Sequence, residues 1–154
     1  METQAQQTQN VEFMIQNIFV KDLSFESPNV PAIFTKPWKG DANVAINTAS
    51  QPLDETHYEV TLSVTVTAKS NNETAYVAEV KQCGIFSITN ISKEQLGPLL
   101  GSYCPSILFP YARENISSLI SRGGFPELQL TPVNFDLLYA QSIQQAAQQN
   151  QTKH

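Results

Sequence analysis

A strictly alternating segment, residues 57–69, constrains the fold of this chain more than any other feature. Six apolar residues, from Tyr58 to Ala68, occupy every second position, and the residues between them are polar. This period of two, with mostly β-branched side chains, predicts a strand with one buried face. The turn-forming residues 70–73 follow, and residues 74–90 continue as a second extended segment. The two segments therefore predict an antiparallel hairpin.

Parity within the second strand of this hairpin separates two sets of side chains. Ala78, Val80 and Gln82 share one parity, and Val77 and Glu79 share the other. Because successive side chains of a strand point to opposite faces, the two sets lie on opposite sides of the sheet.

An earlier extended run, residues 12–26, has an irregular phase. Its apolar positions change parity between Ile15 and Ile18 and change back between Val20 and Leu23. Such a pattern predicts either a β-bulge or a strand that is partly covered on both faces.

The rest of the chain divides into one further strand and a helical last third. The sequence predicts a proline-punctuated crossover over 28–40, a short strand over 43–48, a short or bent helix over 92–103, a longer helix over 106–122 and a final helix over about 134–147. Ser92 and Gln95 form a capping box, and Asn134 caps the final helix. Pro110 is expected near the first turn of the longer helix.

Composition sets the boundaries of the fold. Residues 1–10 and 147–154 are rich in Gln, Asn and Thr and poor in apolar residues, which predicts disordered tails around one domain over 11–146. With a net charge of -5 and no basic cluster, the chain is not expected to bind nucleic acid or a membrane surface. Only 15% of the residues are charged, which makes self-association a reasonable expectation.

Compartment and chemistry are predicted from what the sequence lacks. Residues 1–10 do not form a secretory signal, and no segment is apolar enough for a membrane span, so we expect a cytosolic protein without membrane insertion. Two cysteines and two histidines give no metal-ligand spacing, and the common nucleotide-binding and hydrolase motifs are missing. We therefore expect no catalytic residues, no metal and no cofactor.

The crossover carries Trp38, and the final helix carries Tyr139, neither of which fits an ordinary aromatic core well. A loop that holds a tryptophan above a sheet face could cover a groove for apolar segments.

Three longer motifs then suggest a family. They are residues 21–29 (KDLSFESPN), residues 101–114 (GSYCPSILFPYARE) and the series 122–123 (RG), 125–126 (FP) and 132–136 (PVNFD). In this order they closely resemble the bacterial protein-export chaperone family SecB, over about residues 11–146.

The resemblance implies an α+β subunit in which a four-stranded antiparallel sheet carries its helices on one face. Two subunits join their sheets edge to edge, and two such dimers sandwich the helices, so the expected assembly is a homotetramer, a dimer of dimers. The implied function is that of an ATP-independent holdase. It binds unfolded secretory precursor proteins, keeps them translocation-competent and delivers them to the SecA motor ATPase.

The resemblance also implies three sets of site residues. The client-binding groove would use Trp38, Val44, Ile46, Leu128 and Tyr139. The SecA-docking patch would use Asp22, Glu26, Val77 and Glu79. The tetramer interface would lie at or near Ala78, Val80 and Gln82.

Two departures from the family pattern and two rival functions complete the prediction. Cys83 stands where members commonly have glycine, and its outward parity makes it a candidate reactive thiol; the tail 148–154 has no acidic residue, unlike many tails of the family. One rival is a SecB-like chaperone dedicated to an antitoxin, which the full set of Asp22, Glu26 and Glu79 disfavours. The other is a small cytosolic enzyme or ligand-binding protein, which the missing motifs disfavour.

Overall fold

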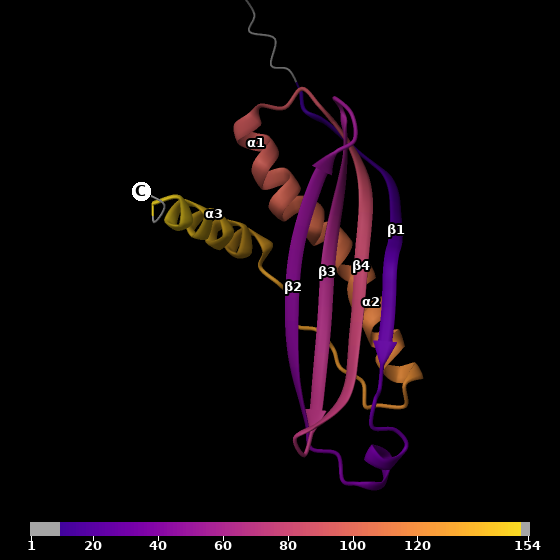
Figure 1. Ribbon diagram of the computed structural model, residues 1–154. Coiled ribbons are helices and arrows are strands. Elements are labelled where there is room, and N and C mark those ends of the chain that lie inside the picture. Colours follow the sequence, from indigo (N-terminus) through magenta and orange to yellow (C-terminus); the bar gives the residue numbers. More distant parts are fainter. Residues whose placement is uncertain (1–9, 152–154) are drawn as a thin grey trace, which may run out of the picture.

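Four long antiparallel strands form one sheet, and a nearly continuous helix crosses one of its faces (Figure 1). The computed structural model describes residues 10–151. The strands are β1 (Glu12–Glu26), β2 (Gly40–Pro52), β3 (His57–Ser70) and β4 (Glu73–Thr89), in the spatial order β1-β4-β3-β2. A short 3-10 helix, η1 (Ala32–Thr35), lies in the crossover between β1 and β2. The predicted four-stranded antiparallel sheet is confirmed.

The β3–β4 hairpin forms as the alternation predicts. Asn71 and Asn72 make the turn with φ of 52° and 65°, a conformation that suits the right-handed twist of the two strands. Val64 lies opposite Val80, and Val66 lies opposite Ala78, so the apolar positions of both strands share one face.

Two bulges in β1 explain its irregular phase. The register against β4 shifts between Ile15 and Asn17 and again between Val20 and Asp22. As a result the apolar residues of β1 all lie opposite helix-side residues of β4, although their parity changes along the sequence. These residues are Phe13, Ile15, Ile18, Val20, Leu23 and Phe25. Of the two expectations for this run, the bulge is confirmed.

Strand β2 is longer than the predicted 43–48. It pairs with β3 without a register shift from Gly40, opposite Ser70, to Pro52, opposite Tyr58. Much of β2 is Asn, Ala, Thr and Ser, which have modest strand propensity. Its length is therefore set by pairing with the regular β3 strand rather than by its own residues.

The two predicted helices over 92–103 and 106–122 are continuous. Helix α1 (Lys93–Pro98) starts where the Ser92 hydroxyl accepts a hydrogen bond from the Gln95 amide, 3.3 Å away. A π-helical turn, η2 (Leu99–Tyr103), joins it directly to α2 (Cys104–Arg122). This wider turn lies just before Pro105, which has no backbone N–H and so cannot donate the usual helical hydrogen bond. Pro110 lies inside α2, so its expected place in a first turn is wrong.

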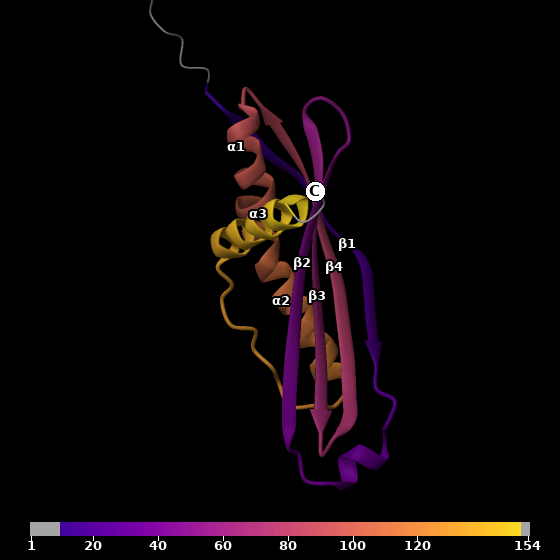
Figure 2. The ribbon, with the colours of Figure 1, turned by 60° about the vertical axis from the view of Figure 1, so that its left-hand side comes forward.

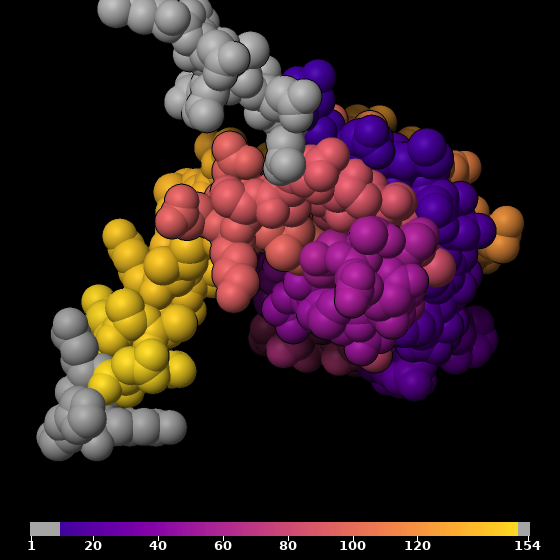
Figure 3. Space-filling view, turned by 90° about the horizontal axis from the view of Figure 1, so that it is seen from above, coloured from indigo at the N-terminus to yellow at the C-terminus, as the bar shows by residue number. Residues whose placement is uncertain are grey.

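Helix α3 (Phe135–Gln151) projects from the body (Figures 2 and 3). The Leu137 amide donates to the Asn134 side chain at 3.1 Å, which confirms the predicted cap. The helix continues four residues beyond the expected end at Ala147, so part of the predicted tail is helical. Residues 1–9 and 152–154, where the tails were also predicted, lie outside the described residues.

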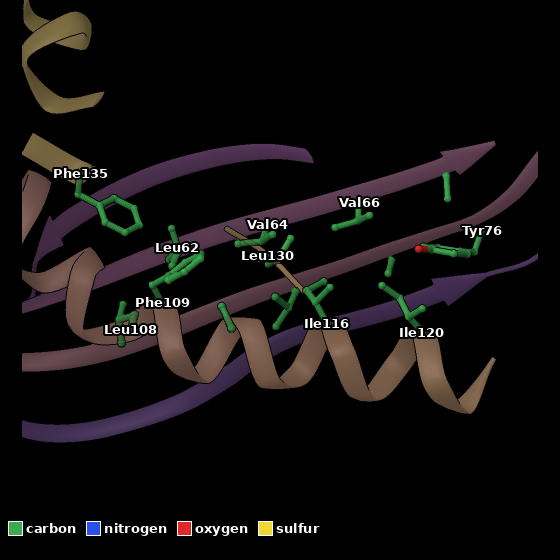
Figure 4. Packing of buried hydrophobic residues seen from close by; sticks show 14 of the residues in the cluster. Leu62, Val64, Val66, Tyr76, Leu108, Phe109, Ile116, Ile120, Leu130 and Phe135 are labelled. Carbon is green, nitrogen blue, oxygen red and sulfur yellow. The ribbon is translucent and has the colours of Figure 1, made fainter. Parts of the chain in front are cut away.

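The core fills the space between α2 and the central strands (Figure 4). Leu62, Val64 and Val66 of β3 point toward Leu108 and Ile116 of α2, and all five are fully buried. The sheet thus carries α2 on one face, as the resemblance implies. No helix in the described part of the chain combines the length and the apolar character needed to span a membrane.

Candidate functional site

Phe125 is the centre of an aromatic cluster at the end of α2. The chain turns at Gly123 and Gly124, which has a φ of 84°, and then inserts Phe125 against the sheet. The Phe125 ring centroid lies 5.0 Å from that of Tyr76, 5.1 Å from Phe34, 5.8 Å from Trp38 and 6.4 Å from Phe25. One buried ring thus fastens both the crossover and the segment after α2 to the sheet.

Trp38 is placed by this cluster and by a glycine of β2. Its indole occupies the space in which a side chain of residue 40 would lie, so Gly40 permits the close approach. Trp38 nevertheless remains 41% exposed. Its ring therefore presents apolar surface beside the first residues of β2.

Two adjoining cavities follow the β2 edge on the helix side of the sheet. The first, of about 230 Å³, lies between Trp38, Ala42 and Leu128. The second, of about 280 Å³, lies between Val44, Ile46 and Leu128. Because Leu128 lines both cavities, they lie side by side, and we call the pair the β2 groove. Four of the five predicted groove residues, Trp38, Val44, Ile46 and Leu128, are therefore brought together.

The outer wall of the β2 groove is an extended segment, residues 126–133, that links α2 to α3. Leu130 is buried in the core, and the Ser117 hydroxyl donates to the Leu128 carbonyl at 3.4 Å. Leu130 and Val133 also line the second cavity. Leu130 and Val133 were not predicted as groove residues, because the segment reaches β2 only through contacts between distant parts of the chain.

Tyr139 lies elsewhere. Its ring covers Gly97 and Gly101, where any side chain would overlap it. Beside it, the Ser102 hydroxyl donates to the Asp136 carboxylate, and the Phe135 ring centroid lies 5.8 Å from that of Phe109. Tyr139 thus docks α3 on the α1–η2 helix, and it lines neither cavity of the β2 groove.

A larger cavity lies on this side of the molecule, apart from the β2 groove. It has a volume of about 700 Å³ and lies between the start of β1, the α1–η2 helix and the start of α3. Phe13, Leu99, Tyr103 and Phe135 are among its apolar residues, and none of the predicted groove residues lines it.

The predicted docking residues lie together on the opposite, outer face of the sheet. Glu26 of β1 pairs with Val77 of β4, and Asp22 pairs with Lys81, two residues beyond Glu79. Directly paired residues share a face, so Asp22, Glu26, Val77 and Glu79 form one surface, which we call the outer patch. Both β1 carboxylates are exposed, and Val77 is half-buried between the strands.

The three residues predicted at the tetramer interface lie beneath α2. Ala78 and Val80 are 0% exposed and Gln82 is 2% exposed in the single chain. The Gln82 side-chain amide donates to the Phe19 carbonyl at 3.2 Å, and Asn115 of α2 donates to the Gln82 side-chain oxygen at 2.9 Å. In the single chain α2 therefore covers these residues, and they position it. Their place at or near the tetramer interface stays a prediction.

Cys83 has the outward parity that the sequence indicates but is buried. Lys21 reaches from β1 across β4 to Glu59 on β3, with 2.9 Å between Nζ and Oε1. The Cys83 thiol lies 3.3 Å from the Thr61 hydroxyl in the same region of the outer face. The candidate reactive thiol is thus wrong, since its side chain has no exposed area. Burial also raises the pKa of the Cys104 thiol to about 12.

His57 lies at the far end of the outer face and takes part in a local turn. Its Nδ1 lies 2.8 Å from Asp54 and its Nε2 lies 3.0 Å from the Gln16 amide. Within residues 10–151 no group of three or more His, Cys, Asp or Glu side chains could hold a metal ion.

Comparisons with known proteins agree with this geometry. The family model described as preprotein translocase subunit SecB matches residues 5–146. A protein-export protein SecB from Methylococcus capsulatus is 51% identical over 140 residues, which are 91% of this chain and 90% of that protein. Its namesake from Marinobacter nauticus is 52% identical over 132 residues, which are 86% of this chain and 80% of that protein.

A solved structure shares the fold. It is a SecB-like chaperone of Mycobacterium tuberculosis in complex with an antitoxin peptide, and it superposes with a TM-score of 0.66 at 17% identity. The match covers 79% of this chain and 90% of that chain.

Proposed function

The chain belongs to the SecB family of protein-export chaperones, and on that premise we propose that it is an ATP-independent holdase. It binds unfolded precursor proteins in the cytosol, keeps them translocation-competent and delivers them to the SecA motor. The family is one of chaperones, which points to a binding protein rather than an enzyme.

The β2 groove carries this proposal. Its lining is mainly aliphatic and aromatic, with Trp38 and Val44 41% and 39% exposed. Each client side chain that such a surface buries contributes roughly 1.5 to 3 kcal/mol without any demand on sequence. A groove of this kind suits many unfolded chains, and folded proteins, which hide their apolar residues, do not compete for it.

The assembly that we propose is a homotetramer in which each subunit offers one β2 groove. Several weak grooves then engage one long client with avidity. The β1 edge supports a sheet-to-sheet contact, because Ile15, Val20 and Leu23 are 42–43% exposed on the helix side. Ala78, Val80 and Gln82 contribute to the assembly through the position of α2. Tyr139 lies outside the groove of the single chain and remains a proposed client contact, because its ring is only half-buried where it covers the α1–η2 helix.

The outer patch is the proposed docking site for SecA. Asp22, Glu26 and Glu79 surround an apolar centre at Val77, a pattern that suits a basic partner surface with an apolar contact. This face is separated from the β2 groove by the thickness of the sheet, so the subunit can hold a client and a motor together.

The two rival functions have less support. A chaperone dedicated to an antitoxin shares the fold, but the likeness to such a structure is only 17% identical, whereas the export proteins are 51% and 52% identical. Membership of a chaperone family argues against a small enzyme or ligand-binding protein.

Two substitutions test the proposal by separating its faces. Trp38→Ala should weaken binding of a urea-unfolded secretory precursor several-fold without changing the mass measured by light scattering, about tenfold for each 1.4 kcal/mol lost. Leu53→Ala, an exposed residue outside the groove, serves as the matched control. Glu79→Lys should abolish SecA binding and leave client capture intact. Loss of client capture in Glu79→Lys, or unchanged client affinity in Trp38→Ala, would contradict the assignment of the two faces.

A further inference from the structure

Lys81 lies inside the outer patch. It is paired directly with Asp22 across the β1–β4 register and is two residues from Glu79 on the same face. Cross-strand neighbours have Cβ atoms about 4.5–5.5 Å apart, and residues two apart on a strand are about 7 Å apart. The Lys81 ammonium therefore stands within reach of two of the three carboxylates that make the patch acidic.

Two other lysines lie on this face, and Lys69 of β3 is paired with Asp41 of β2 rather than with a carboxylate of the patch. Lys21 pairs with Glu59 at 2.9 Å, so these two charges cancel each other beside the patch. Within the described part of the chain no ion pair or hydrogen bond holds the Lys81 ammonium. Lys81 is half-buried, and its charge acts on the patch itself.

Lys81 changes the net charge of the outer patch. Asp22, Glu26 and Glu79 give the outer patch three negative charges, and Lys81 reduces its net charge to -2. A basic partner surface that approaches Val77 must meet this one positive charge among the carboxylates. Like charges placed together in an interface slow the encounter and weaken the complex.

We propose that Lys81 is a built-in attenuator of the outer patch: it weakens docking of a basic partner surface and so keeps that docking reversible. This inference rests on the proposed function, because the partner is the SecA motor assigned to the patch. A carrier that must return for another client gains from a short-lived complex, and one charge in the centre of a docking site controls its lifetime more directly than charges at the rim.

The test is the affinity of the full-length chaperone for SecA, measured by surface plasmon resonance at several salt concentrations. Lys81→Gln should tighten binding about three- to tenfold at low salt, mainly through a slower dissociation rate. The gain should fall as salt rises, since the Debye length shortens to about 8 Å at 0.15 M. Lys81→Arg keeps the charge and should bind as the original protein does.

Lys93→Gln is the matched control, because it removes one positive charge at the start of α1, on the other side of the sheet. A similar gain in Lys93→Gln would mean that net charge alone acts and would overturn the proposal. Weaker or unchanged binding in Lys81→Gln would also overturn it, because Lys81 would then contact a carboxylate of the partner or face none of its charges. Glu79→Lys in the same assay tests the docking site separately from the role of Lys81. If this variant binds SecA normally, the proposed docking site itself is wrong.

Discussion

The two edge strands of the sheet, β1 and β2, share one surface chemistry and differ in what lies above it. Both place apolar side chains on the helix side, and α2 packs mainly on the central strands β3 and β4. Over β2 the segment 126–133 supplies a second wall, whereas Ile15, Val20 and Leu23 of β1 remain 42–43% exposed and form an open strip, which we call the β1 strip. A flat open strip and a walled groove therefore suit different partners.

A flat strip suits a rigid surface of the same shape. β1 is long, and its two bulges keep the apolar residues on one face along its whole length. A second sheet edge can cover such a strip with both backbone hydrogen bonds and apolar contacts. The β2 groove is narrower and is bounded by a chain without regular structure, which suits a single extended segment of a flexible client.

Leu23→Lys is the strongest test of this contrast. If the β1 strip is covered in the assembly, an ammonium buried there without a partner costs about 3–5 kcal/mol, and a two-fold contact contains the residue twice. We expect light scattering to show subunits of lower mass, while circular dichroism shows the fold retained, since Leu23 is 43% exposed in the single chain.

Two matched variants complete that test. Ser24→Lys introduces the same charge on the outer face of the same strand and should leave the assembly intact. Val44→Lys introduces it in the β2 groove and should weaken client binding without changing the mass. If Leu23→Lys keeps the mass of the assembly and loses client binding, the roles of the two edges are reversed.

Phe125→Ala should break the wall of the β2 groove. Phe125 is buried against four aromatic rings, and truncation of a buried phenylalanine costs about 3–5 kcal/mol. We expect a lower midpoint in urea denaturation and weaker client binding. Phe34→Ala, which removes an exposed ring of the same cluster, should cost much less. Equal losses in the two variants would mean that Phe125 is not the centre of the cluster.

The contrast between the two edges also marks how far the sequence predicts the structure. The phase change in residues 12–26 predicted either a bulge or a strand covered on both faces, and the bulge is confirmed, because apolar parity is a local signal. The length of β2 was not predictable, because its residues have little preference of their own and its strand state comes from β3. The π turn before Pro105 and the insertion of Phe125 depend likewise on contacts between distant residues.

Site residues follow the same rule. The outer patch residues were placed on the correct face by parity and by resemblance, and the register brings them together. The outward parity of Cys83 is correct but did not show that its side chain is buried. Parity also could not show that α2 covers Ala78, Val80 and Gln82 completely. Burial depends on the third dimension, which alternation along one strand does not contain.

Gly101→Ala should loosen the far end of the groove wall and leave the β1 strip unaffected. The new methyl group would overlap the Tyr139 ring, and such overpacking costs about 1–3 kcal/mol. Because α3 holds the end of the segment 126–133, we expect faster amide hydrogen exchange in α3 and in that segment. In a Tyr139→Ala background the overlap is relieved, so the added cost of Gly101→Ala should vanish. An undiminished cost would place the strain within the helix instead.

Asp54→Asn gives the smallest expected effect and probes the turn that fastens the end of β2 to β3. The amides of Thr56 and His57 donate to the Asp54 carboxylate at 2.9 and 2.8 Å, and His57 Nδ1 lies 2.8 Å from it. The Thr56 backbone hydrogen bond, followed by the His57 side chain, lowers the pKa of Asp54 from 3.8 to about 2. Because the folded pKa is the lower one, the carboxylate stabilises the turn fully above about pH 4 and loses this effect as the pH falls toward 2.

The Thr56 amide proton in an NMR titration should therefore report a transition near pH 2 that Asp54→Asn lacks. The melting temperatures of the two proteins should differ slightly at pH 7 and converge as the pH approaches 2. Leu53→Ala in the same turn keeps the carboxylate and should show the same low-pH transition as the original protein. A Thr56 transition near pH 4 would mean that the carboxylate is not held by these donors, and the end of β2 would then be anchored by strand pairing alone.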